Sequence, residues 1–238
     1  MNRRRIVALA GVAVACLVVA TGGCSRVVLD PGPSTSEQRE IDDPTRVHLK
    51  TPGRLVIGVG PTASLTVTAG ENVIDDLTAV TEDGELTLGV SSALGDLGDV
   101  QYDLVLPDVD QLTLSGSGSI EGQIAAQAGL TIRAEGSGSV RLEPIEVDSL
   151  DVRIAGTGDV RLEGTAARQD VSVEGTGSYD APGLVTEDTT VEISGTGSAD
   201  VNATGTLDAH VSGTGSVRYT GDPQVTSTVD GTGRVEKQ

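Results

Sequence analysis

The sequence is poor in aromatic residues, cysteine and histidine. Its 238 residues include no Phe, no Trp and three Tyr, which excludes an aromatic core and argues against a sugar site built on aromatic platforms. The two cysteines, Cys16 and Cys24, are too few for a disulfide framework or a cysteine metal cluster. The two histidines, His48 and His210, are expected at the surface rather than as a metal ligand or a catalytic base.

Positive charge is also scarce. The chain has 16 Lys and Arg against 35 Asp and Glu, and its formal net charge is -19. Such a surface repels phosphate groups, so nucleic acid is a poor partner and the body of the protein should stand away from anionic lipid head groups. We expect the charge to serve solubility, with specific cation binding as the alternative.

Residues 1–23 resemble a bacterial lipoprotein signal peptide. Arg3–Arg5 precede an apolar stretch over residues 6–20, and the small residues Thr21-Gly22-Gly23 stand just before Cys24. The resemblance implies cleavage before Cys24, lipidation of this residue, and attachment to the lipid bilayer on the extracytoplasmic side of the cell membrane. The alternatives are ordinary secretion and an uncleaved anchor, for which fifteen residues are short.

Two regions separate this segment from the second half of the chain. Residues 24–45 contain three prolines and a polar cluster, which predicts a flexible tether. Residues 46–110 alternate apolar and polar residues in short irregular runs, which predicts an N-terminal β-rich part or cap, with one turn of helix at 71–76. The predicted strands cover residues 47–50, 55–59, 65–68, 77–81, 85–90 and 102–106.

From residue 111 to residue 238, one tripeptide recurs at intervals of 18 to 20 residues. It is Gly-Ser-Gly in the first two copies and Gly-Thr-Gly in the other five. A period of this length is typical of stacked repeats, in which each unit buries its apolar side against its neighbours. The first glycines of the tripeptides are Gly116, Gly136, Gly156, Gly175, Gly195, Gly213 and Gly231.

Apolar residues recur two residues before and four residues after the first glycine of each tripeptide, as in Ile154 and Val160. Around them the chain alternates with a period of two, the pattern of strands that have one buried side. A unit of this length fits one coil of two or three short strands. The sequence therefore predicts an all-β parallel β-helix of about seven coils, stacked roughly 4.8 Å apart.

The order of these segments resembles the GIN-domain family of auto-transporter adhesin heads. The resemblance rests on Gly84–Leu88, Tyr102–Pro107, the repeated tripeptides, and Val217–Pro223 followed by a last Gly-Thr-Gly. It covers about residues 46–235. It implies a right-handed parallel β-helix exported to the cell envelope, and it implies no catalytic residues and no cofactor.

The tripeptides have two interpretations. In the structural one, the glycines allow a tight corner and the central hydroxyl bonds a neighbouring backbone. In the functional one, the hydroxyls form an outward ladder that binds a glycan or ice, and a second column follows two residues later. The candidate ladder comprises Thr157, Thr176, Thr196, Thr214 and Thr232, preceded by Ser117 and Ser137. The second column comprises Ser119, Ser139, Asp159, Ser178, Ser198, Ser216 and Arg234.

Together these patterns predict an exported, lipid-anchored, non-enzymatic binding or adhesin-like module of the cell envelope. Its β-helix faces would be presented to a protein or glycan partner, with no cofactor and no metal site. The alternatives are a carbohydrate-active β-helix enzyme and an ice-binding or crystal-binding plane. The sequence makes no prediction of the oligomeric state.

Overall fold

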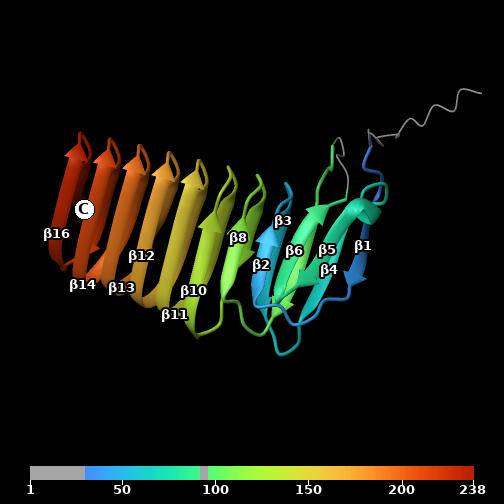
Figure 1. Cartoon of the computed structure of the whole chain (residues 1–238). Coiled ribbons are helices and arrows are strands. Elements are labelled where there is room, and N and C mark those ends of the chain that lie inside the picture. The colour runs from blue at the N-terminus through green and yellow to red at the C-terminus, as the bar shows by residue number, and fades with distance from the viewer. Residues whose placement is uncertain (1–29, 92–95) are drawn as a thin grey trace, which may run out of the picture.

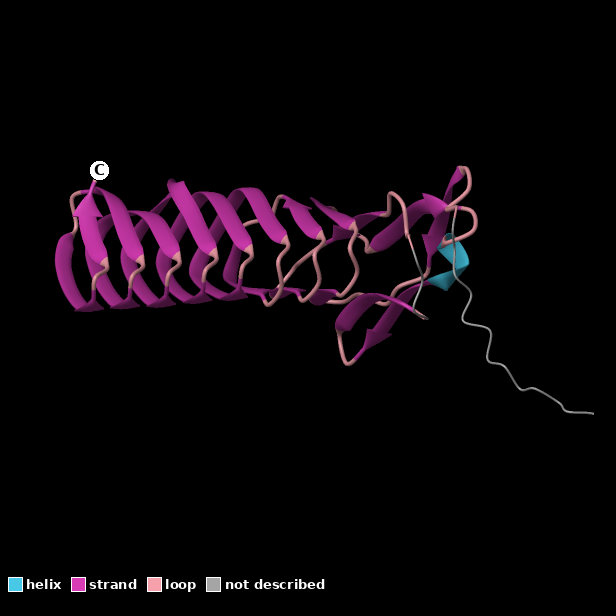
Figure 2. Cartoon of the chain, turned by 90° about the horizontal axis from the view of Figure 1, so that it is seen from above, coloured by secondary structure: helices cyan, strands magenta, loops and turns pink. Residues whose placement is uncertain are grey.

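The chain forms a right-handed parallel β-helix, which confirms the predicted fold class (Figure 1). The computed structural model describes residues 30–91 and 96–238, so the predicted signal peptide and Cys24 lie outside the described residues. The coils stack along a rod with the N-terminal strands at one end and the C-terminal strands at the other (Figures 1 and 2). No helix in the described part of the chain is long and apolar enough to cross a membrane.

Successive coils contribute strands to two faces, which we call face A and face B. Four long strands run along face B, bend, and end on face A: β11 (Ser139–Gly156), β12 (Asp159–Gly175), β13 (Ser178–Gly195) and β14 (Ser198–Gly213). Face A also contains β6 (Glu85–Val90), β2 (Arg46–Leu49), β8 (Gln111–Leu114), β10 (Gln127–Ala134) and β16 (Gln224–Gly231). Face B also contains β7 (Gln101–Leu106), β3 (Arg54–Val59), β9 (Ser119–Gly122), β15 (Ser216–Gly221) and β17 (Arg234–Lys237).

The core is a stack of aliphatic side chains between the two faces. Ile154 and Val160, on either side of one tripeptide, are 1% and 0% exposed. The equivalent positions of the other coils are also buried, except in the last coil, where Val229 is 39% exposed. Because equivalent residues lie in register on neighbouring parallel strands, each aliphatic side chain packs on the coils before and after it. This stacking replaces the aromatic core that the composition excludes.

One buried cluster in the core is polar. The Gln169 side chain, 1% exposed, donates to Thr186 Oγ1 at 3.2 Å and to Thr189 Oγ1 at 3.1 Å. It accepts a hydrogen bond from the hydroxyl of Tyr179 at 2.8 Å. Burial raises the pKa of Tyr179, so the phenol remains a neutral donor. Every member of this cluster has a hydrogen-bond partner, and these bonds offset the desolvation cost of burying its polar groups.

The predicted strands of residues 46–110 are confirmed as β2 to β7, with the expected turn of helix as η1 (Ile74–Asp76), but only some of them cap the rod. Strands β2 and β3 belong to the parallel stack, where their coil lies between that of β6 and β7 and that of β8 and β9. The corner of this coil is Thr51-Pro52-Gly53 and not Gly-x-Gly. The coil therefore lacks the tripeptide by which the repeats are recognised in the sequence.

The N-terminal end of the rod is closed by antiparallel strands. On face A, β5 (Leu77–Glu82) pairs with β6, and on face B, β4 (Ser64–Gly70) pairs with β7. Strand β1 (Ser34–Arg39) pairs antiparallel with β4 and forms the outermost layer. The change from parallel to antiparallel pairing marks the end of the coils.

The prediction of a flexible tether does not hold for Ser34–Arg39, which forms β1. The Ser36 hydroxyl lies 2.8 Å from the Thr68 hydroxyl, and Arg39 donates to the carbonyl oxygen of Ile74 at 2.8 Å. None of the six residues of β1 is fully buried. A polar edge strand of this kind lacks the apolar alternation by which strands are recognised in a sequence.

Candidate binding surface

The glycines of the tripeptides are required by the close approach of successive corners. Gly175 has a φ of +120°, and a Cβ on it would lie 2.6 Å from the carbonyl oxygen of Gly156 one coil earlier. A Cβ on Gly177 would lie 2.5 Å from the Cγ2 atom of Ile154. No side chain fits at either place, so the first interpretation of the glycines, as a structural corner, is correct.

Backbone hydrogen bonds join each corner to the one before it. The N–H of Thr176 donates to Gly156 O at 2.9 Å, and the N–H of Ser178 donates to Gly158 O at 3.2 Å. The same bonds recur at the following corners, for example from Thr196 N to Gly175 O at 2.9 Å. The seven tripeptides are therefore equivalent corners of consecutive coils, and their backbone polar groups are used within the fold.

The central hydroxyls of the corners point into solvent. All seven residues are exposed, and none of their hydroxyls makes a hydrogen bond among residues 30–91 and 96–238. The expected bond from the hydroxyl to a neighbouring backbone is thus not observed, and at the five threonines the backbone N–H of the same residue donates to the preceding corner instead. We call these residues the corner row: Ser117, Ser137, Thr157, Thr176, Thr196, Thr214 and Thr232.

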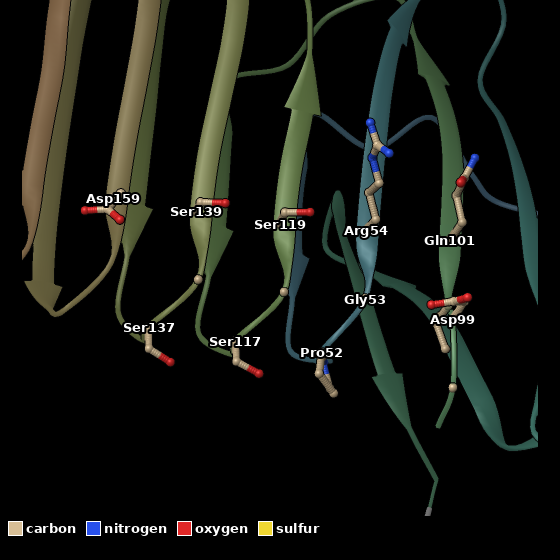
Figure 3. A pocket seen from close by; sticks show the side chains of 14 residues that line it. Pro52, Gly53, Arg54, Asp99, Gln101, Ser117, Ser119, Ser137, Ser139 and Asp159 are labelled. Carbon is tan, nitrogen blue, oxygen red and sulfur yellow. The ribbon is translucent and has the colours of Figure 1, made fainter. Parts of the chain in front are cut away.

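The second column runs beside the corner row on face B. Its members are in register on neighbouring strands, as Ser139 is with Ser119 and Asp159. Figure 3 shows the side chains of these three residues in a line across the strands. Arg54 and Gln101, which precede the repeats, continue the column toward the N-terminal end.

The N-terminal half of this surface is hollowed. A shallow depression of about 630 Å³ lies where the corners of Ser117 and Ser137 meet Pro52, Arg54 and Asp99 (Figure 3). Its lining offers hydroxyl donors and acceptors, one guanidinium group and carboxylates, and it contains no aromatic ring. Such a set of groups can hydrogen-bond a polar ligand but cannot stack on it.

A third column on face B, two residues beyond the second column, carries charges of both signs. The Arg218 side chain donates to both carboxylate oxygens of Asp200, each at 2.6 Å, and Asp200 raises the pKa of the Arg218 guanidinium. Arg161 pairs with Asp180, and Arg54 binds Glu121 at 2.6 Å. These ion pairs lie at the surface and are exposed or only partly buried, so each contributes about 1 kcal/mol or less.

The two histidines lie in one outward column of face A but on distant strands, β2 and β14. Both therefore lie at the surface, as we predict, although the side chain of His48 is half-buried. Its Nε2 lies 2.8 Å from Ser115 Oγ, and its Nδ1 lies 3.7 Å from Glu85 Oε1. The second distance is too long for a hydrogen bond, so Glu85 does not orient the ring as the acid of a Ser-His-acid triad does.

Acidic side chains on face A do not converge on one point. A depression of about 710 Å³ there is lined by Arg133 and Arg153 as well as by Asp151, Asp170 and Glu192. In the part of the chain that the structure describes, no three His, Cys, Asp or Glu side chains are placed to hold a metal ion.

Comparison with solved structures supports the fold. A "putative adhesin" from Bacteroides fragilis matches with a TM-score of 0.82 and 22% identity, covering 87% of this chain and 97% of the other. A "putative lipid binding protein" from Parabacteroides distasonis and a "putative adhesin" from Parabacteroides merdae match with TM-scores of 0.70 and 0.69. Both are 22% identical, with the same coverage of 87% and 97%. At this identity, the likeness establishes the fold alone.

No curated protein matches the sequence. A family model described as "Putative auto-transporter adhesin, head GIN domain" matches residues 43–223. The match begins just before β2 and ends just before β16, so it includes most coils and most of the corner row. The chain therefore belongs to the GIN-domain family.

Proposed function

We propose that the protein is an exported, lipid-anchored, non-enzymatic module of the cell envelope that binds a partner along the corner row. The observation that carries this proposal is the row itself. Seven hydroxyls repeat at the spacing of the coils, are exposed, and have no partner within residues 30–91 and 96–238. Since the glycines alone account for the corners, the hydroxyls are available for contacts with another molecule.

A neutral glycan is the partner that these groups fit best. Hydroxyls repeated about every 4.8 Å, with serines and charged groups beside them, can exchange hydrogen bonds with a polymer that is rich in hydroxyls. The net charge of -19 disfavours polyanions such as nucleic acids or strongly acidic polysaccharides. A protein partner is the other outcome of the same experiment.

Family membership supports binding rather than catalysis. The family description names adhesin heads, and two of the similar structures are each described as a "putative adhesin". Within the described residues, the Ser115 and His48 pair on face A has no hydrogen-bonded carboxylate. Ice or crystal binding requires a uniform flat plane, and Asp159 and Arg234 interrupt the second column of this surface.

The binding surface is tested by removing hydroxyls from the corner row. In the full chain, Thr157→Val, Thr176→Val and Thr196→Val are combined, because Val keeps the shape of Thr without its hydroxyl. Binding is measured on a glycan array and to isolated cell envelopes. We expect the variant to lose roughly tenfold or more in affinity, since several hydrogen bonds of about 1 kcal/mol each are lost.

The matched control replaces three threonines away from the corner row: Thr131→Val, Thr165→Val and Thr190→Val. It removes the same number of hydroxyls, and we expect it to bind as the wild type does. Equal binding by both triple variants, with unchanged unfolding temperatures, would refute the corner row as the contact. Failure of the wild type to bind any glycan or envelope fraction would refute the binding function.

The anchor is tested separately on Cys24. The Cys24→Ser variant should no longer incorporate a labelled fatty acid in cells, and the protein should leave the membrane fraction. The control Cys16→Ser should remain labelled, because that residue lies inside the segment predicted to be removed. Labelling that survives Cys24→Ser would contradict the proposed anchor without bearing on the corner row.

A further inference from the structure

The C-terminal end of the rod is open, in contrast to its N-terminal end. Within residues 30–91 and 96–238, β16 pairs only with β14, and all its residues are exposed. Val225 and Val229 of β16 are each 39% exposed, whereas their partners in register, Leu207 and Val211, are 1% and 0% exposed. The core side chains of the last coil are therefore without a covering layer in the described chain.

The other end shows what such a layer looks like. There β5, β4 and β1 add antiparallel strands to the two faces, and η1 lies beside them (Figures 1 and 2). An exposed, regular strand edge with apolar side chains is a template for pairing with another strand. An antiparallel strand on β16 would cover the open end as the N-terminal strands cover theirs.

The backbone groups of β16 that face outward can be identified from the other coils. The carbonyl oxygen of Leu114 accepts from Glu135 N at 2.8 Å, in the coil that follows. Val229 occupies the same column as Leu114, so its carbonyl group points away from β14. In a parallel ladder, the N–H and C=O of one residue face the same side, and the direction alternates along the strand. Val225 and Ser227 therefore also present their N–H and C=O groups outward.

The sequence of β16 suits pairing with itself. Val225-Thr226-Ser227-Thr228-Val229 reads the same in both directions. In an antiparallel pair with a two-fold axis at Ser227, Val225 lies opposite Val229 of the second copy. Hydrogen-bonded pairs alternate with non-hydrogen-bonded pairs in such a ladder. In this register, residues 225, 227 and 229 form the hydrogen-bonded pairs. These are the residues whose backbone N–H and C=O groups point away from β14.

The charge of this end permits the contact. Residues 224–238 contain two acidic and two basic residues and are neutral in formal charge, whereas the whole chain carries -19. Two copies therefore repel one another less at this end than elsewhere. On β17, Lys237 forms an ion pair with Asp222 at 3.0 Å. A lysine on an edge strand opposes pairing, which confines the contact to β16.

We propose that the open end is a homophilic contact, in which β16 pairs antiparallel with β16 of a second copy and the two cores become continuous. The interface uses the same surface on both copies, as a two-fold contact requires. The two N-terminal ends then lie at opposite ends of a doubled rod. If each copy is attached through its N-terminal segment, as the proposed function has it, the copies come from two facing surfaces.

Cross-linking at the two-fold axis tests the register. In the full chain with Cys16→Ser and Cys24→Ser, the variant Ser227→Cys places two cysteines at a hydrogen-bonded antiparallel pair. Their Cα atoms would be about 5.5 Å apart, within the range of a disulfide. We expect a disulfide-linked dimer under mild oxidation. The control Thr226→Cys should remain monomeric. In this register Thr226 lies opposite Thr228 of the second copy, so the two introduced cysteines are two residues apart along the ladder. Equal cross-linking of the two variants, or none with Ser227→Cys, would overturn the proposed pairing.

Sedimentation of the full chain in detergent tests the contact without cysteines. We expect the wild type to dimerise with concentration and Val229→Lys to weaken the dimer roughly tenfold or more, because a charge would be buried. The control Val80→Lys changes an exposed valine of the N-terminal end and should dimerise normally. A monomeric wild type, or a dimer lost with Val80→Lys instead, would overturn the proposal. Neither result would alter glycan binding by the corner row, so the two proposals can fail separately.

Discussion

The backbone N–H of Thr196 donates to the carbonyl oxygen of Gly175 at 2.9 Å, while the hydroxyl of Thr196 is left in solvent. This one contact separates the two roles of the repeated tripeptide. The backbone and the glycines make the corner, and the hydroxyl takes no part in it. Stability and binding should therefore respond to different residues of the same tripeptide.

The first prediction concerns the glycines. Gly175→Ala should lower the free energy of unfolding by about 3 kcal/mol, because it combines a positive φ with a clash against the corner before it. The control Gly129→Ala lies in β10, where the nearest atom to the new Cβ would be 3.7 Å away, and should be nearly neutral. Urea unfolding of the two variants decides the matter. Equal stabilities would show that the corners are not closely stacked.

The second prediction concerns two buried tyrosines. Tyr179→Phe removes the hydrogen bond to Gln169 and should cost roughly 1 to 2 kcal/mol, because a buried amide oxygen loses its partner. Among residues 30–91 and 96–238, the buried hydroxyl of Tyr102 makes no hydrogen bond, so Tyr102→Phe should cost less than Tyr179→Phe. Thermal unfolding measures both. A larger loss in Tyr102→Phe than in Tyr179→Phe would contradict the assigned hydrogen bonds.

The third prediction is a dependence of stability on pH through His48. Burial, and then the charge of Lys50, lower the pKa of His48 below 6.5, and Glu85 and Glu135 oppose this effect. The unfolded chain then binds the proton more readily than the folded one, so this residue makes the protein less stable as the pH falls through 6.5. His48→Gln should remove that part of the loss.

Unfolding temperatures at about pH 7.5 and pH 5.5 test this effect of His48. The fall between the two values should be smaller in His48→Gln than in the wild type. The control His210→Gln changes the exposed histidine of β14 and should leave the fall as it is. A fall that is unchanged in His48→Gln would contradict the effect of burial on this ring.

Much of the fold was predictable because the repeat imposes the same local chemistry on every coil. The buried columns, exemplified by Ile154 and Val160, and the corner glycines follow from spacing alone. The repeat pattern does not predict the coil of β2 and β3, because its corner contains Pro52 and because it enters the stack out of chain order. Strand β1 is not predictable for another reason: pairing with β4 stabilises it, and none of its side chains is fully buried.

The candidate surface was predictable in position but not in detail. The residues of the corner row can be identified from the sequence. The direction of their side chains cannot, because it depends on whether the backbone N–H or the hydroxyl donates to the carbonyl oxygen of the preceding corner. The additions of Arg54 and Gln101 to the second column depend on strand pairing across long stretches of chain. The same holds for the polar cluster around Gln169, a residue that stands at an aliphatic position of the coil.

The most direct test of the account is whether neighbouring members of the corner row lie one strand apart. In the full chain with Cys16→Ser and Cys24→Ser, Thr176→Cys and Thr196→Cys are introduced together. Stacked corners place their Cα atoms about 4.8 Å apart with both side chains outward, so an intramolecular disulfide should form under mild oxidation. The pair Thr157→Cys and Thr196→Cys, two coils apart, should stay reduced. A disulfide in the distant pair and none in the neighbouring pair would contradict the stacked row on which the proposed function rests.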